Sequence, residues 1–427
     1  MSKIIEKTFC YVCLWLVVMA AAGLAQTRTP AAPYDQKLWQ QALKIQRGAI
    51  VVDSHNDVTT PMTSSDYDIG NPPPNTPYRT SLATMRAGGL TAEFFSLYIK
   101  PYYATKGGAA RRTLEMIEAV QRAVERYPRQ LVFATTPEEI RRAKKQDKIA
   151  CLMGIEGGHA IENSLATLRV FARLGVRYMT LTWNNDNDWA DAGRGKKTHN
   201  GLTDFGKEVV REMNRVGMLV DVSHVSDKTM SDALDVSAVP VIASHSSARA
   251  LKNVPRNIPD DLLRRIGQNG GVVMVNMYQY FIDPAIDKAN DERDARLKAQ
   301  YAALDEKYKD DPEARAQAGD ELEAANPLPN TPVAVIVDHI EHIIKVAGLD
   351  HVGLGADFDG ALDMGEIRDV SGLPLITYEL LKRGYKEPDI RKILGENFLR
   401  VFAASEKYTR EKGGRLSGDG SLRRINK

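Results

Sequence analysis

Short apolar runs separated by amphipathic segments dominate the chain from about residue 50 onward. Eight of these runs have the length of buried parallel strands, which are continuously apolar; they lie at 51–57, 90–99, 150–155, 176–183, 218–223, 239–244, 271–278 and 351–356. Helical spacing of apolar residues marks intervening segments, including 164–174, 205–217, 226–237, 259–269 and 332–347. This alternation predicts a (β/α)8 barrel of the TIM type, with an active site at the C-terminal ends of its strands.

A doubly wound open sheet is the alternative fold for this alternation. Such a sheet commonly carries a glycine-rich turn after its first strand, and no such turn follows Val52. The length of 427 residues suits one barrel domain, predicted over 26–404, with insertions. The highly charged segment 282–330 has helical spacing and is expected to form a solvated helical insertion before the last strand. The polar, glycine-rich residues 405–427 are expected to be a flexible tail.

Metal-ligating residue types recur where these strands end. His55 and Asp57 follow the first strand and, being two residues apart, point the same way. Later strands lead into Glu156, His224, His245 and the pair Asp357 and Asp359. A single histidine or carboxylate at such a position is usually an ordinary surface or core group. The recurrence at successive strand ends is what predicts a shared site.

The donor set favours two metal ions rather than one. His55 and Asp57 form one group, His224 and His245 form another, and Glu156 lies between them in strand order. Glu156 can therefore give one oxygen to each ion. Mixed nitrogen and oxygen ligands suit zinc, and also manganese, cobalt or iron. Two such ions about 3.5–4 Å apart bind and deprotonate a bridging water and polarise the bond that it attacks.

Composition and charge narrow the class of protein. The chain is 43% hydrophobic and 26% charged, which is ordinary for a globular domain. Its 57 basic and 55 acidic residues give a net charge of +2, which argues against nucleic acid or an anionic membrane as partner.

The N-terminus has the pattern of a signal peptide. Lys3 and Lys7 precede an apolar run from Phe9 to Leu24, and small residues precede a predicted cleavage after Ala25. A retained membrane anchor is the competing interpretation, but the run is shorter than the roughly 20 residues that a spanning helix prefers. We expect residues 1–25 to be removed and the protein to be exported, periplasmic or secreted, without a stable membrane anchor. Cys151 would then be the only cysteine left, so no internal disulfide can form.

Several blocks, in a fixed order, resemble the membrane dipeptidase (renal dipeptidase) family, a zinc peptidase branch of the amidohydrolase-type barrels. The blocks span Gly48 to Phe402 and read VDSHND, RAGGLTAEFFSLY, GIEGGHAIENSLATLRVFARLGVRYMTLTW, NRVGMLVDVSHVS, VIASHSSARAL, VPRNIPDD and GLGADFDG. The resemblance implies metal ligands at the same five residues selected above, with Glu156 bridging. It further implies that Arg256 holds the substrate carboxylate and that Asp357 carries protons for the bridging water and the departing amine.

Elementary chemistry agrees with these two further roles. Arg256 lies in a loop just before a helix, where a planar guanidinium can hold a carboxylate through two hydrogen bonds. Asp357 directly follows the eighth strand, so we prefer it to Asp359, its rival on the same face, as the catalytic partner of Glu156. His159 is expected to orient a loop rather than to bind metal.

One position departs from the family pattern. Where the family has a histidine that contacts the substrate carbonyl after the fourth strand, this chain has Trp183. Indole donates one hydrogen bond but carries no charge, and losing an oxyanion-stabilising donor costs about 10²–10³ in rate. Three explanations stay open: the Trp183 N–H substitutes, His199 or Asn184 supplies the donor, or the substrate differs from the usual dipeptides.

The sequence therefore predicts an exported dipeptidase with two Zn²⁺ ions per chain. It is expected to hydrolyse free dipeptides, with Arg256 excluding longer C-terminal extensions, and the resemblance implies a homodimer. One alternative is another metal-dependent amidohydrolase, acting on a cyclic amide, a lactone or an N-acyl amino acid. The other is a barrel that binds a ligand without turnover, against which the retained ligands and Asp357 argue.

Overall fold

The computed structural model describes residues 26–361 and 363–412. The predicted signal peptide, 1–25, and the last part of the predicted tail, 413–427, lie outside the described residues. The boundary placed at residue 405 is wrong, because helix α17 (Asn397–Glu411) runs across it and continues through residue 411. Among the described residues, no helix combines the length and apolar character needed to cross a bilayer.

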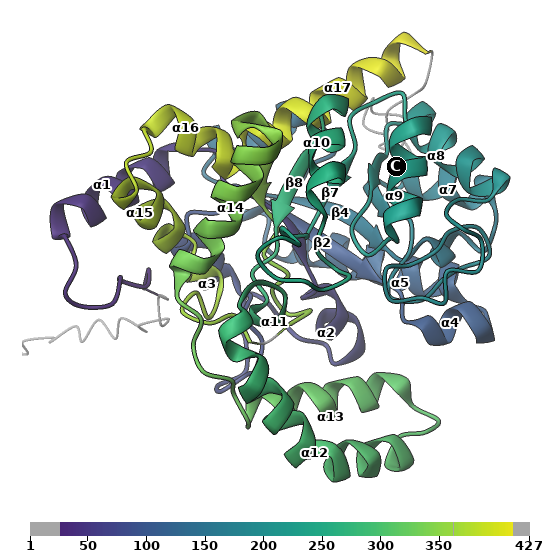
Figure 1. Cartoon of the computed structure of the whole chain (residues 1–427), viewed down its shortest axis with the longest axis horizontal. Helices are drawn as coiled ribbons and strands as arrows, with labels where there is room; N and C mark the ends of the chain where they lie inside the picture. Colours follow the sequence, from purple (N-terminus) through teal and green to yellow (C-terminus); the bar gives the residue numbers. More distant parts are fainter. Residues whose placement is uncertain (1–25, 362, 413–427) are drawn as a thin grey trace, which may run out of the picture.

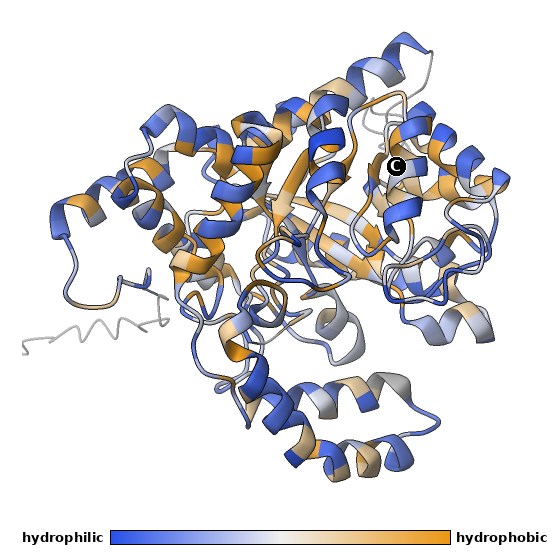
Figure 2. Ribbon diagram, in the orientation of Figure 1, coloured by the Kyte–Doolittle hydropathy of each residue, from blue (hydrophilic) through white to orange (hydrophobic). Residues whose placement is uncertain are grey.

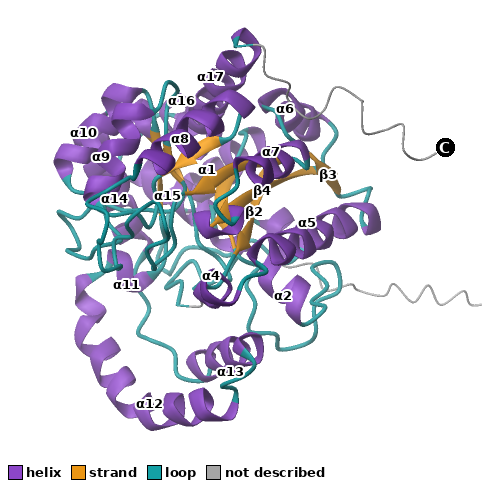
Figure 3. Cartoon of the chain, turned by 90° about the vertical axis from the view of Figure 1, so that its right-hand side faces the viewer, coloured by secondary structure: helices purple, strands orange, loops and turns teal. Residues whose placement is uncertain are grey.

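Eight parallel strands form a closed barrel. They are β1 (Val52–Asn56), β2 (Ala92–Tyr98), β4 (Ile149–Glu156), β5 (Val176–Thr180), β6 (Leu219–Asp221), β7 (Ile242–Ala243), β8 (Val272–Val275) and β9 (Val352–Leu354). Each pairs in parallel with its neighbour, and the ring closes where β1 pairs with β9 and where β2 pairs with β4. Helices surround these strands (Figures 1 and 3). The structure confirms the predicted (β/α)8 barrel, with each strand inside or next to its predicted range.

A ninth strand, β3 (Leu131–Phe133), lies outside the ring and has no counterpart in the sequence prediction. It pairs with the first part of β4, where Leu131 lies opposite Ile149. The last part of the same edge of β4 pairs with β5, where Glu156 lies opposite Thr180. A three-residue strand is too short to give a recognisable pattern of apolar positions.

The helices fill the connections between strands. Their bounds are α1 (Gln36–Gly48), α2 (Thr59–Ser64), α3 (Leu82–Ala87), α4 (Pro101–Lys106), α5 (Ala109–Arg126), α6 (Pro137–Lys145), α7 (Leu165–Arg173), α8 (Asp204–Val216), α9 (Asp227–Val236), α10 (Asp260–Asn269), α11 (Gln279–Ile282), α12 (Asp287–Lys307), α13 (Pro312–Ala324), α14 (Val333–Ala347), α15 (Pro374–Lys382) and α16 (Glu387–Arg391). Local signals set several ends: the Thr203 side chain caps α8, and Gly217 ends it in the left-handed conformation at φ 74°. These caps fix where each helix returns the chain to the barrel.

The apolar core has two layers, one inside the barrel and one between the strands and the helices. Phe94, Leu152 and Met274 fill the barrel interior together with Phe398 and Phe402 of α17. The rings of Phe94 and Phe398 meet edge to face at 5.2 Å. In Figure 2 the strands and the helix faces turned toward them are hydrophobic. Helix α17 therefore contributes apolar side chains to the interior of the barrel.

The charged segment 282–330 forms a helical hairpin, as the sequence predicts. Helices α12 and α13 extend away from the barrel (Figures 1 and 3) and are largely hydrophilic (Figure 2). The base of the hairpin is held by buried Leu297 and by an ion pair between Arg293 and Asp363.

Candidate metal centre

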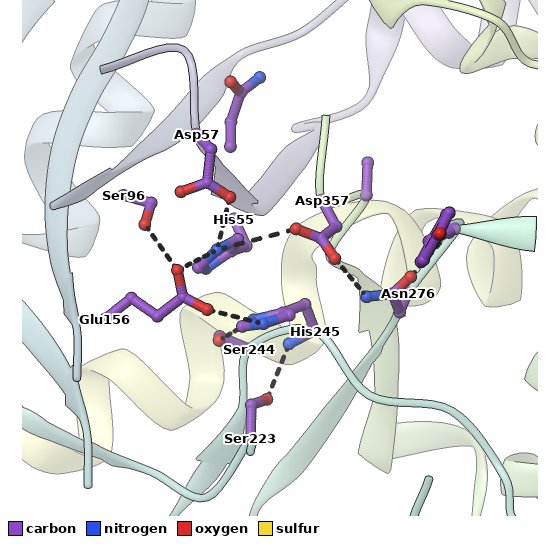
Figure 4. A network of polar contacts seen from close by, with 12 residues as sticks. His55, Asp57, Ser96, Glu156, Ser223, Ser244, His245, Asn276 and Asp357 are labelled. Carbon is purple, nitrogen blue, oxygen red and sulfur yellow. Dashed lines mark hydrogen bonds and ion pairs between the residues drawn. The ribbon is translucent and has the colours of Figure 1, made fainter. Parts of the chain in front are cut away.

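His55 lies at the end of β1 and Asp57 directly after it, and their side chains point toward each other and toward Glu156, as Figure 4 shows. Both are buried, and His55 Nε2 lies 3.3 Å from Asp57 Oδ2. The same nitrogen lies 3.5 Å from Glu156 Oε2, which comes from the end of β4. These three side chains place one ligand atom each within 4.8 Å of one another, a spacing that can hold one metal ion.

Glu156 turns its other oxygen toward a second group. Its Oε1 lies 2.7 Å from His224 Nε2 and 3.4 Å from His245 Nε2. Glu156, His224 and His245 also place ligand atoms within 4.8 Å of one another. All five ligand residues that the sequence selects are therefore brought together, and Glu156 is shared by the two groups.

The ring nitrogens that point away from the centre are held by neighbouring side chains. His55 Nδ1 lies 2.8 Å from the Tyr178 hydroxyl, and His224 Nδ1 lies 3.0 Å from Asn184 Oδ1. When Nδ1 donates to such an oxygen, Nε2 carries the free lone pair that a metal ligand needs. These contacts therefore favour the Nε2 atoms as the ligand atoms.

His245 is positioned through a longer chain of hydrogen bonds. Its Nδ1 lies 2.8 Å from the hydroxyl of Ser244, which donates to Asp221 Oδ2 at 2.5 Å. Thr180 donates to the same oxygen at 2.6 Å. Asp221 ends β6 and is fully buried. It therefore ties β6 to Thr180 of β5 and, through Ser244, fixes the ring of His245.

Two residues at the centre have unusual backbone conformations. His224 has φ 67° and Asp357 has φ 68°, in the left-handed region that non-glycine residues rarely occupy. Such a conformation costs of order 1–3 kcal/mol and is found preferentially at functional sites. The turns after β6 and β9 thus hold a strained backbone conformation that directs the side chains of His224 and Asp357 toward the centre.

Asp357 joins the centre from the end of β9. Its Oδ1 lies 4.0 Å from His55 Nε2, and its Oδ2 accepts a hydrogen bond of 2.8 Å from Asn276. Asp357 forms a further candidate metal group with His55 and His245. Its rival Asp359 is in none of the candidate groups among the described residues; its Oδ1 accepts a hydrogen bond from the backbone N–H of Arg79 instead.

The electrostatics of the centre fit divalent cations. Burial, and next the charge of Asp57, raise the pKa of Glu156 to about 7. Burial lowers the pKa of both His224 and His245, which keeps these imidazoles neutral, as metal ligands must be. Burial favours a lower pKa for His55, but Tyr178, Glu156 and Asp57 together outweigh this effect. The pKa of His55 is therefore raised well above its usual value. A proton on His55 would therefore partly neutralise these carboxylates in the metal-free protein.

Unpartnered atoms point to the same conclusion. His55 Nε2 and Asp57 Oδ1 are buried and make no hydrogen bond within the described part of the chain. Leaving such atoms unsatisfied is costly, and coordination of a metal ion would satisfy both. The residues therefore fit a metal pair.

Arg256 lies beside the centre. It is 3% exposed, and its Nη2 donates to the backbone carbonyl of His245 at 3.1 Å. Its Nε and Nη1 are buried without a hydrogen-bond partner among the described residues, and its guanidinium carbon lies 5.3 Å from the centre of the Phe281 ring. Burial lowers the pKa of Arg256 to about 10; Asp357 and Glu156 counteract this, and Arg194 adds to it. Arg256 is thus a buried cation with free donors.

Comparison with known proteins identifies this architecture. The family model for membrane dipeptidase (peptidase family M19) matches residues 39–414. The chain belongs to the membrane dipeptidase family. It is therefore a metallo-dipeptidase, a hydrolase of peptide bonds with a metal cofactor, as the sequence predicts.

Solved structures of similar proteins agree with this assignment. The probable dipeptidase PvdM from Pseudomonas aeruginosa is 27% identical, with a TM-score of 0.74 over 88% of this chain and 100% of that one. Two others, each 24% identical with a TM-score of 0.68 over 84% of this chain, share its fold. They are the dipeptidase AC, a metallopeptidase of family M19 covered over 98% of its length, and a metallopeptidase from Rhodobacter sphaeroides liganded with a phosphinate mimic of the dipeptide L-Ala-D-Ala, covered over 99%.

Trp183 lies at the candidate metal centre of this dipeptidase, at the position where the resemblance implies a histidine. Its half-buried ring is 6.0 Å from the ring of His224 and 5.1 Å from that of Tyr98. Of the two substitute donors considered from the sequence, Asn184 accepts at Oδ1 from His224 and keeps its side-chain NH2 as a donor, whereas His199 is bonded through Nε2 to a backbone carbonyl in its own loop at 2.8 Å. The indole therefore walls the site where the family has an imidazole.

His159 takes the place expected for a loop-orienting residue. It is buried and belongs to no candidate metal group in the described ranges. Its ring packs so closely against Gly157, which has φ 108°, that a Cβ there would approach within 2.6 Å of it. His159 thus fixes the turn that follows Glu156.

Sequence reasoning missed several residues that hold the candidate ligands, namely Tyr178, Asp221, Ser244 and Asn276, and it considered Asn184 only as a donor to the substrate. Each lies on a barrel strand or just after one, as the ligands do. No spacing rule pairs them with their histidines or carboxylates, because every one of these contacts except that of Ser244 joins different strands.

Proposed function

We propose that this protein is an exported dinuclear-zinc dipeptidase that hydrolyses the peptide bond of free dipeptides. The observation that carries the proposal is the position of Glu156, whose two oxygens face two separate groups of metal-ligating side chains. The dipeptide mimic bound by the similar Rhodobacter sphaeroides metallopeptidase supports a dipeptide as substrate.

One ion would be held by His55, Asp57 and Glu156, and the other by Glu156, His224 and His245. Imidazole nitrogen and carboxylate oxygen are the donors of catalytic zinc sites, although other divalent metals accept them too. A bound metal pair supplies a water of lowered pKa and polarises the scissile carbonyl.

Arg256 is assigned to the C-terminal carboxylate of the dipeptide. Its Nε and Nη1 carry N–H groups without a partner among the described residues, and either can donate a charge-assisted hydrogen bond to a carboxylate. Arg256 is buried, and charge–charge attraction grows as the local dielectric constant falls. Its attraction for a carboxylate is therefore stronger than that of an arginine on the surface. A substrate extended at its C-terminus presents an amide at this point, so Arg256 selects against tripeptides.

Asp357 is assigned as the proton carrier. Burial raises its pKa to about 6, against the opposing charges of His55 and Arg256. A carboxyl group with a pKa near the operating pH both accepts and returns a proton readily. Asn276 fixes one oxygen and leaves the other facing the centre, where it can take a proton from the attacking water and deliver it to the departing amine nitrogen.

Export and assembly complete the proposal. The signal-peptide pattern of residues 1–25 supports a periplasmic or secreted enzyme. A homodimer is proposed only from the family resemblance.

The proposal is tested by assaying purified protein, reloaded with zinc after chelation, on a panel of free dipeptides. Tripeptides and C-terminally amidated dipeptides serve as matched controls. We expect hydrolysis of free dipeptides that is lost on chelation and restored by metal, with little activity on either control. Equal cleavage of amidated and free dipeptides would instead favour a broader amidohydrolase.

A further inference from the structure

A second arginine stands beside Arg256 and has no role in the proposed mechanism. Arg194 lies in the loop between β5 and α8, and its side chain is exposed. Its guanidinium carbon lies 5.4 Å from the centre of the Phe281 ring, the same ring that Arg256 approaches at 5.3 Å. The sum of these two distances is an upper limit on the separation of the two guanidinium carbons. A four- or five-carbon diacid can bridge that separation.

The loop that carries Arg194 is fixed to the site. The backbone N–H of Gly193 donates to the carbonyl of His224 at 2.7 Å. A Cβ on Gly193 would lie 3.0 Å from the carbonyl oxygen of Pro255 and 3.2 Å from that of His224, so the loop is wedged between the metal centre and the loop of Arg256. The position of Arg194 is therefore set by the site itself.

Phe281 is also fixed relative to Arg256. The side chain of Asn257, the next residue along, donates to the carbonyl of Phe281 at 2.7 Å. Phe281 is 8% exposed, so its ring is buried beside Arg256 rather than lying on the surface. Both arginines are thus held around one rigid aromatic side chain.

Arg194 makes no hydrogen bond and no ion pair with any residue in the described ranges. Both guanidinium groups are positively charged and approach the same ring, so the two cations repel each other. A cation over an aromatic ring at an exposed position gains only about 0.5–1 kcal/mol. An anionic group between the two guanidinium groups would relieve this repulsion.

We propose that Arg194 binds the side-chain carboxylate of an acidic C-terminal residue, so that the preferred substrates are dipeptides ending in aspartate or glutamate. This inference rests on the proposed function, in which Arg256 holds the α-carboxylate of the same residue. The two carboxylates of one dicarboxylic amino acid then meet the two arginines that flank Phe281.

The test compares acidic dipeptides with their isosteric amides. For the zinc-loaded enzyme, kcat/KM is measured on Ala-Asp against Ala-Asn and on Ala-Glu against Ala-Gln. We expect the acid to be preferred by about tenfold in at least one pair, as one charge-assisted hydrogen bond at a partly solvated position provides. Arg194→Gln should reduce that ratio to near one, and the change should appear mainly in KM. Added salt should lower the ratio of the wild type, because screening weakens exposed charge pairs.

Lys196→Gln is the matched control, since it removes one positive charge from an exposed residue of the same loop. Lys196→Gln should leave the ratio of kcat/KM between acid and amide substrates unchanged. Arg194→Lys should retain part of the preference for acids. No preference for acids in the active wild type, or an equal loss on acids and amides in Arg194→Gln, would overturn the inference while leaving the proposed function intact. A metal-loaded wild type inactive on every dipeptide would overturn both.

Discussion

Replacing Arg256 by alanine should abolish recognition of the free C-terminus. The guanidinium is 3% exposed and offers two buried N–H groups without a partner among the described residues. Each charge-assisted hydrogen bond contributes about 1.5–3 kcal/mol. Losing the charge-assisted hydrogen bonding of a carboxylate to this buried cation, with some compensation by water, should cost about 3–4 kcal/mol of transition-state stabilisation, or roughly 10²–10³-fold in kcat/KM.

The assay is a cycle of two changes, one in the enzyme and one in the substrate. Wild type and Arg256→Ala are each measured on Ala-Ala and on its C-terminal amide. Amidation of the substrate should lower the kcat/KM of the wild type by a factor similar to that of the mutation. It should hardly change the kcat/KM of Arg256→Ala, because the partner of the carboxylate is already gone. Arg265→Ala, which removes a partly exposed arginine of α10, should behave as wild type.

Stability measurements separate lost binding from lost folding. Burial lowers the pKa of Arg256, which means that its charge is held in the folded chain at a cost. Arg256→Ala should therefore retain or slightly raise the Tm, and its metal content should match that of wild type. The assignment fails if the variant loses less than about tenfold in kcat/KM, or if amidation impairs it as much as wild type.

Three other predictions follow from residues around the metals. Tyr178→Phe removes the hydrogen bond to His55 Nδ1 and should weaken metal affinity about 10–100-fold in a competition titration with a chelator; unchanged affinity would exclude this positioning role. Trp183→His should leave metal content unchanged and barely help simple dipeptides, because the indole shapes the pocket; a gain of about 10²–10³ in kcat on every dipeptide would show that a lost oxyanion donor had been limiting. Asp357 and Asp359 have pKa values raised by burial to about 6 from 3.8, so the folded metal-free protein binds more protons than the unfolded chain in that interval. The Tm of chelated protein should thus fall as the pH rises from about 4 to 6, and the stabilisation by added zinc should grow over the same interval; the opposite trend would contradict these shifts.

The barrel was predictable because its strands are buried on both faces. Such strands are continuous apolar runs, and each ends abruptly at a polar residue such as His55, Glu156 or Asp357. Since parallel barrel strands all end at one face, strand order alone places these residues together. The five candidate metal ligands could therefore be named without any knowledge of distances, and the structure brings all of them together.

Features that depend on contacts between distant strands were not predictable. The hydrogen bond between Tyr178 and His55 joins residues 123 positions apart, and that from Asn276 to Asp357 joins residues 81 apart. The strand β3 is too short to leave a pattern, and it exists because β4 extends beyond β5 and offers a free edge. Residues 405–411 are polar enough to suggest a tail, yet Ser405 and Thr409 are buried within α17.

The role of Arg194 was also invisible in the sequence. Nothing in the stretch AGRGKK distinguishes it from the lysines that follow. Only the folded chain places it near the Phe281 ring, which Arg256 of the motif VPRNIPDD also approaches.

Metal analysis of the purified protein tests the central claim most directly. Glu156 contributes one oxygen toward each of two ligand groups, so wild type should hold about two ions per chain and Glu156→Gln should lose occupancy at both positions. Glu212→Gln, which changes a carboxylate of α8 paired with Arg169 and Arg215, should keep both ions. A single ion per chain, retained in Glu156→Gln, would contradict the dinuclear account.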